Sequence, residues 1–118
     1  MDIRKLVYDT LTADTALCAL LATPTDSIYM SYSVDAGTYP VIVISMVDDV
    51  PAFHADNIEL ASIVRFQISI ITEDAEYDTI EDLVKNDLIN IGAMRSISTE
   101  YREKNLHYRI LQFRIANT

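Results

Sequence analysis

Glycine, proline and cysteine are scarce in this 118-residue chain, which has two glycines, three prolines, one cysteine and no tryptophan. Two glycines cannot form a glycine-rich phosphate-binding loop, and the sequence contains no nucleotide-binding or nucleophile-elbow motif. A single cysteine cannot form an internal disulfide, which is typical of a reducing compartment. No apolar run reaches the roughly 18 residues of a membrane-spanning helix, and the N-terminus lacks the apolar stretch of a signal peptide. We therefore expect a cytosolic protein without a membrane partner.

Basic residues are also few, since nine Lys and Arg oppose eighteen Asp and Glu for a formal net charge of −9. A surface this acidic repels a phosphate backbone, so specific binding of nucleic acid is not expected. Apolar residues make up 50% of the chain, which is enough for a folded core. The length predicts one domain over residues 1–118.

The few basic residues are concentrated near the C-terminus. Residues 91–118 hold five Lys and Arg against two acidic residues, whereas residues 1–90 hold four against sixteen. Four of those five basic residues are arginines. Arginine makes bidentate hydrogen bonds with carboxylates and is enriched at protein interfaces. We expect a basic edge that docks onto the acidic body of a neighbouring subunit. The predicted subunit-contact residues are Arg95, Arg102, Arg109 and Arg114 on the basic side and Glu73, Asp74 and Glu76 on the acidic side.

Hydrophobic spacing predicts three helices and five strands. The expected helices cover residues 2–11, a short segment capped by Asp14 and ended by Thr23-Pro24, and residues 77–90; the expected strands cover 28–30, 41–47, 58–72, 93–102 and 106–116. Asp74 or Asp78 is expected to cap the third helix, Gly92 to follow its end, and Asn105 to take a left-handed position in the last turn. The order ααβββαββ predicts an α+β fold, with a mostly antiparallel sheet of four or five strands and helices packed on one face.

Residues 48–57 contain Pro51 and no clear periodicity, which predicts a long loop between two strands. Phe53 would be costly in water, so it packs either on its own domain or on a partner. Asp48, Asp49, His54 and Asp56 could also bring an imidazole and carboxylates to a divalent cation. No second His or Cys lies at ligand spacing, so a plain exposed loop is favoured and no metal is predicted.

Catalytic and nucleic-acid-binding interpretations of the remaining motifs are weaker than structural ones. Cys18 lies among leucines and is expected in the core. His107 has no identifiable nucleophile in its sequence context. Tyr101, Tyr108 and Phe113 could stack nucleic-acid bases among the arginines, but ordinary cross-strand packing is favoured. We predict no enzyme activity and no cofactor.

The order and spacing of the motifs resemble those of the tail-terminator, or tail-completion, proteins of long-tailed bacteriophages and prophages. The likeness covers nearly the whole chain. It lies in residues 3–14, Ala16-Leu17, Ile28-Tyr29, Tyr39-Pro40-Val41-Ile42-Val43, residues 66–70, the helix after Tyr77, and residues 108–114.

The resemblance implies a non-enzymatic virion protein that forms a ring, usually a hexamer, at the head-proximal end of the tail. Such a ring assembles in the host cytoplasm, caps the tail tube protein and joins it to the head-tail connector protein, while DNA passes through without specific binding. Val50, Phe53 and His54 would then contact a ring neighbour or the tube. Two alternatives remain: another head-to-tail connector component or small adaptor, and, third, a metal-dependent enzyme using the acidic loop.

Overall fold

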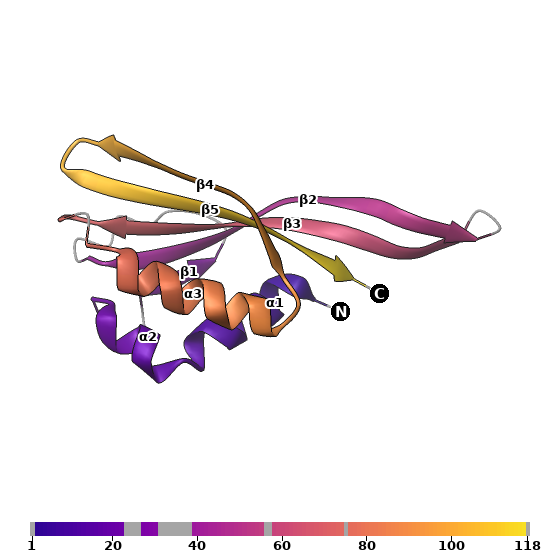
Figure 1. Ribbon diagram of the computed structural model, residues 1–118, viewed down its shortest axis with the longest axis horizontal. Helices are drawn as coiled ribbons and strands as arrows, with labels where there is room; N and C mark the ends of the chain where they lie inside the picture. Colours follow the sequence, from indigo (N-terminus) through magenta and orange to yellow (C-terminus); the bar gives the residue numbers. More distant parts are fainter. Residues whose placement is uncertain (1, 23–26, 31–38, 56–57, 75, 118) are drawn as a thin grey trace.

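The computed structural model describes residues 2–22, 27–30, 39–55, 58–74 and 76–117, with the backbone alone at 50–55, 58–61 and 117. Its elements are α1 (Ile3–Thr12), α2 (Thr15–Leu20), β1 (Ile28–Met30), β2 (Val41–Ala55), β3 (Ile58–Thr72), α3 (Asp78–Asn90), β4 (Met94–Glu103) and β5 (Leu106–Asn117). The five strands form one sheet in the order β1-β2-β3-β5-β4. Among the strands that the structure describes, only the β1–β2 pairing is parallel. The helices cover one face of the sheet (Figure 1), so the α+β prediction is confirmed.

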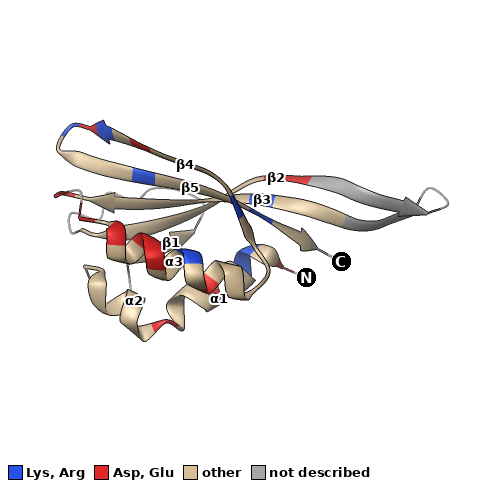
Figure 2. Ribbon diagram, viewed as in Figure 1, with Lys and Arg blue, Asp and Glu red and all other residues tan. Residues whose placement is uncertain are grey.

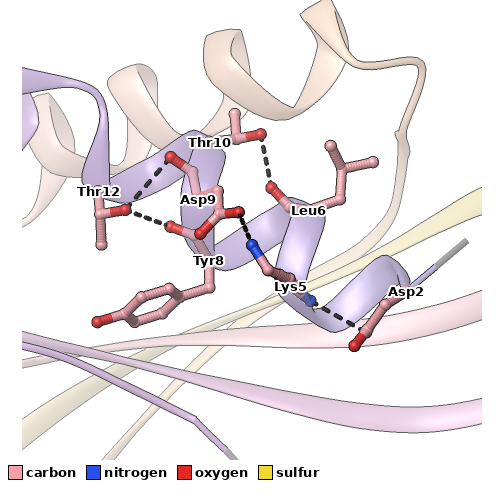
Figure 3. A network of polar contacts seen from close by, with 7 residues as sticks. All are labelled: Asp2, Lys5, Leu6, Tyr8, Asp9, Thr10 and Thr12. Carbon is pink, nitrogen blue, oxygen red and sulfur yellow. Dashed lines mark hydrogen bonds and ion pairs between the residues drawn. The ribbon is translucent and has the colours of Figure 1, made fainter.

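Local hydrogen bonds fix both ends of α1 (Figure 3). Asp2 caps the helix by accepting a hydrogen bond from the Lys5 backbone N–H at 3.1 Å. The Lys5 ammonium also donates to Asp9 at 2.8 Å, one turn further along. Thr10 and Thr12 donate to the carbonyls of the preceding turn. The predicted apolar stripe is buried, and it anchors α1 to the sheet through Ile3, Val7 and Leu11.

Asp14 caps α2 as predicted, because its carboxylate accepts the Leu17 backbone N–H at 3.1 Å. The helix ends at Leu20, before the predicted stop at Thr23-Pro24, which lies outside the described residues. Cys18 is a buried free thiol, which confirms its predicted place in the core. Burial raises the pKa of this thiol, so it is a packing group rather than a nucleophile.

The start of α3 differs from the prediction. Tyr77 is its N-cap, and no side chain makes a capping hydrogen bond there. Asp74 instead accepts the Glu76 backbone N–H at 3.0 Å in a tight turn ahead of the helix, and Asp78 is already helical. Gly92 follows the helix with a φ of 96°, a left-handed conformation that glycine adopts without a side-chain clash, as expected.

The main core lies between the helices and one face of the sheet, where Phe66 of β3 stacks on Phe113 of β5 with ring centroids 5.6 Å apart. The opposite, helix-free face is not uniformly polar. A second apolar cluster there contains the buried residues Val41, Val43 and Ile71. The side chains of β3 alternate between the two faces of the sheet, and its helix-free face is solvent-exposed only in part.

The predicted loop over residues 48–57 is wrong, because β2 continues to Ala55 and pairs with β3 as a long hairpin. We call residues 48–55 with 58–65 the β2–β3 arm. The register shifts between Met46 and Asp48 and twice between Pro51 and His54, which indicates β-bulges. Strand β1 pairs with residues 42–44 of β2 and does not reach Pro51. At Pro51, β2 therefore pairs on one side only, with β3, and such an edge position tolerates proline. In Figure 1 the arm extends well beyond the helices.

The β4–β5 hairpin closes the chain at the other side of the sheet. Its turn places Lys104, not the predicted Asn105, in the left-handed region, with a φ of 56°. The turn lies at the opposite end of the molecule from the tip of the arm (Figure 1). The sequence also predicts a loop around Gly37, at residues 33–38, and this segment lies outside the described residues.

Candidate assembly interface

The β4–β5 hairpin carries all four predicted contact arginines, but on two different faces. Cross-strand partners share a face, so Arg95 lies with Phe113, and Arg102 with His107, on the helix side. Arg109 also faces this side, whereas Arg114 faces the helix-free side. Figure 2 shows these basic segments along β4 and β5 and the acidic segments gathered at the start of α3. The four arginines share one hairpin with Glu100 and Glu103 and do not form one continuous patch, so the basic docking edge stays a prediction.

Arg109 is engaged inside the subunit. Its Nε donates to Glu81 of α3 at 2.5 Å, and its guanidinium lies 5.9 Å from the Tyr77 ring centroid. Lys85 lies 3.0 Å from the other oxygen of the same carboxylate. Burial acts to raise the pKa of Glu81, but the bonds from Arg109 and Lys85 outweigh it and hold this pKa below its usual range. The contact ties β5 to α3.

Arg95, Arg102 and Arg114 are exposed. Arg95 donates to Ser98 on its own strand at 3.1 Å. Within the described part of the chain, no ion pair engages any of the three. Their guanidinium groups are therefore available for carboxylates outside the subunit.

Arg114 belongs to a charged row on the helix-free face. The row crosses Asp48 of β2, Arg65 of β3 and Arg114 of β5, which are successive cross-strand partners. The Arg65 guanidinium donates two hydrogen bonds to the Asp48 carboxylate, and the one from Nε to Oδ1 is 2.8 Å long. The hydrogen bond from Arg65 lowers the pKa of Asp48. Asp48, which was considered as a possible cation ligand, thus already has an arginine partner at the base of the arm.

The predicted acidic residues Glu73, Asp74 and Glu76 are exposed between β3 and α3. Asp74 and Glu76 line a surface hollow of about 350 Å³, which we call the acidic hollow. Its lining consists of Leu20, Pro40, Asp74, Glu76, Asp78, Thr79 and Ile80. Carboxylates beside the exposed Leu20 offer both charge and apolar contact to a partner.

The predicted contact residues Val50, Phe53 and His54 lie on the arm, where the structure describes only the backbone. Their role stays a prediction. Among the side chains that the structure places, no group of three His, Cys, Asp or Glu could hold a metal ion. Asp56, the last of the four suggested ligands, lies outside the described residues.

The hairpin aromatics pack within the sheet. Phe113 is fully buried against Phe66, and Tyr101 stacks on its cross-strand partner Tyr108 with centroids 4.6 Å apart. This confirms the favoured interpretation of cross-strand packing. His107 is half-buried opposite Arg102.

Sequence reasoning missed a set of exposed apolar side chains on β4: Met94, Ile97 and Tyr101. The sequence separates them by three and four residues, so period-two alternation does not reveal them. A bulge between Arg95 and Ile97 brings all three to the helix-free face.

Comparisons with known proteins find similar chains among solved structures. No protein-family model matches the sequence, and no curated protein matches it. A solved structure described as "Virion of native gene transfer agent (GTA) particle" contains a chain similar to this one, with a TM-score of 0.63 and 24% sequence identity. The match covers 92% of this chain and 88% of that chain. The two chains share a fold along nearly their whole length. No helix in the described residues is long and apolar enough to cross a membrane.

Proposed function

We propose that the protein is a non-enzymatic structural component of a phage-like particle, and that it acts as a tail terminator. Copies form a ring, hexameric on the tail, which caps the tail tube and joins it to the head-tail connector. The observation that carries this proposal is the fold shared with a chain of a virion particle over 92% of the present chain. The motif order described above supports the same assignment.

The distribution of charge is compatible with a ring. A closed ring needs a head-to-tail contact between two unlike surfaces of the same subunit. The β4–β5 hairpin, with Arg95 and Arg102 on one face and Arg114 on the other, offers one such surface. The second is the exposed acidic segment that contains Glu73, Asp74 and Glu76. Arg109 contributes indirectly, because its bond to Glu81 holds the hairpin against α3.

The β2–β3 arm is suited to a contact outside the ring. It extends beyond the helix-packed core and carries Val50, Phe53 and His54 (Figure 1). We place the tube or a ring neighbour there. The protein would assemble in the host cytoplasm and remain in the virion at the head-proximal end of the tail, with DNA passing through the ring unbound.

A tube-growth assay tests the proposal. The protein is added in small amounts to polymerising tail tube protein, and growth is followed by light scattering. A terminator stops elongation at substoichiometric amounts, because one ring blocks one tube end. A connector component leaves elongation unchanged and binds head portals instead, and that result would reject the terminator assignment.

A further inference from the structure

Strand β4 presents an exposed apolar strip at the edge of the sheet. It is the outer strand after β5 in the sheet order, and nine of its ten residues are exposed. On its helix-free face, Met94, Ile97 and Tyr101 are 58%, 53% and 49% exposed. We call these three residues the β4 strip.

The charges of β4 do not protect this strip. Arg95, Glu100 and Arg102 share the face of Phe113, Arg109 and His107, on the helix side. Within β4 itself, the strip face carries no charge between Met94 and Glu103, and Arg114 of β5 lies opposite Met94 at one end of the strip. Tyr101 continues the strip onto β5 by stacking on Tyr108. Edge strands of free monomers are normally short, covered or charged, since an exposed apolar edge pairs with other chains. The strip therefore has the character of a contact surface.

We infer that a second copy of this chain covers the β4 strip, and that this contact is the principal ring interface; the inference rests on the proposed function. A partner on this edge meets apolar side chains on one face of β4 and two cations, Arg95 and Arg102, with one anion, Glu100, on the other. Its surface must therefore combine apolar and acidic groups.

The chain itself supplies such a surface. The acidic hollow places Leu20, which is 41% exposed, beside Asp74, Glu76 and Asp78. A contact between β4 of one copy and the acidic hollow of the next joins two unlike surfaces, as a closed ring requires. It also matches arginines with carboxylates and apolar groups with apolar groups.

Substitution of Ile97 tests the inference, with Ile89 as a matched control. Ile89 lies on α3 and is 57% exposed, so Ile97→Lys and Ile89→Lys make the same change at nearly equal exposure. Self-association of the full chain is measured by light scattering and sedimentation across concentration, alone and on tail tubes. We expect Ile97→Lys to weaken it about tenfold or more and Ile89→Lys to leave it near wild type.

Several outcomes would overturn the inference. Normal self-association of Ile97→Lys would do so, as would an equal loss in both variants. Normal self-association with lost tube binding would show that the tube covers the strip instead. Thermal unfolding checks the fold of each variant. Should Ile97→Lys not fold, Ile97→Thr keeps a β-branched residue and removes most of the apolar contact.

A failure of the proposed function would give a different result. In that case neither the wild-type protein nor any variant at position 97 would self-associate or stop tube growth. A wild type that caps tubes, together with an Ile97→Lys variant that caps them equally well, would reject only the β4 interface.

Discussion

At the scale of single residues, a pair of carboxyl groups joins α2 to α3. Asp14 caps α2, and Asp87 of α3 has a buried Oδ2 that receives no hydrogen bond from any described group. Burial is the largest cause that raises the pKa of Asp87, and the neighbouring Asp14 adds to it, so that this pKa reaches about 7. The hydrogen bond with Asp87 lowers the pKa of Asp14. Asp87 therefore holds a proton that it donates to Asp14 below neutral pH.

This pair predicts that stability falls as pH rises from about 4 to about 7. In that window the unfolded chain releases the Asp87 proton while the folded chain retains it, so folding becomes less favourable until the folded group also ionises. In Asp87→Asn the amide donates to Asp14 at every pH. We expect the variant to gain on the order of 1–3 kcal/mol relative to wild type between pH 5 and pH 8.

Urea unfolding at several pH values measures this difference. Asp82→Asn, an exposed change on the same helix, is the control, and its profile should follow that of the wild type. Parallel profiles for Asp87→Asn and wild type would show that no proton is held between the two carboxyl groups.

Arg109 provides a second residue-scale prediction, because its bond to Glu81 belongs to the folded subunit. Arg109→Met leaves the buried Glu81 carboxylate with Lys85 as its remaining ion-pair partner among the described residues. We expect a loss of about 1–3 kcal/mol in unfolding free energy. Arg114→Met, on the helix-free face, should change stability by no more than about 0.5 kcal/mol. Equal stability of both variants in denaturant titrations would contradict an internal role for Arg109.

At the scale of elements, the β2–β3 arm is separable from the core. Asp49 and Val64 are cross-strand partners, so an Asn-Gly turn can join them directly and replace residues 50–63. Among the side chains described on β3, which begin at Ser62, the helix-packed cluster reaches no earlier than Val64, and we expect the shortened protein to fold. It should still self-associate through β4 but lose tube binding.

Circular dichroism, light scattering and tube co-sedimentation measure these three properties of the arm deletion. A scrambled arm of the same length and composition is the matched control for loss of specific contacts. Retained tube binding in the deletion would place the tube contact elsewhere on the subunit.

Elements with strong periodicity could be predicted closely from the sequence. The bounds of β3 match the predicted 58–72, and Asp14 caps α2 as its position before an apolar run indicates. The continuation of β2 could not be predicted, because bulges break its alternation around Pro51. The bond between Arg109 and Glu81 spans 28 positions and depends on how α3 lies against β5, which no local pattern encodes. The β4 strip could not be predicted for a related reason, because one bulge between Arg95 and Ile97 changes which residues of β4 share a face.

At the scale of the whole molecule, the subunit is elongated, with extents of 52 × 28 × 22 Å. The arm reaches out at one end, and the turn of the β4–β5 hairpin lies at the other (Figure 1). The proposed contacts to ring neighbours and to the tube would therefore use separate parts of the same chain.

Charge predicts a salt-dependent ring contact. Arg95→Glu with Arg102→Glu should weaken self-association most at low salt, because repulsion from neighbouring carboxylates is then least screened. Arg4→Glu with Lys5→Glu on α1 makes the same change in net charge at exposed positions and serves as the control. Sedimentation at about 0.05 M and about 0.5 M salt measures the self-association of the two double variants and distinguishes them. Equal behaviour would mean that net charge, and not the hairpin, controls association.

Electron microscopy of tail tubes incubated with the protein tests the central claim most directly. We predict a ring, hexameric and open at its centre, at one end of each tube and nowhere along its length. Tubes without such rings, or coated along their sides, would contradict the account.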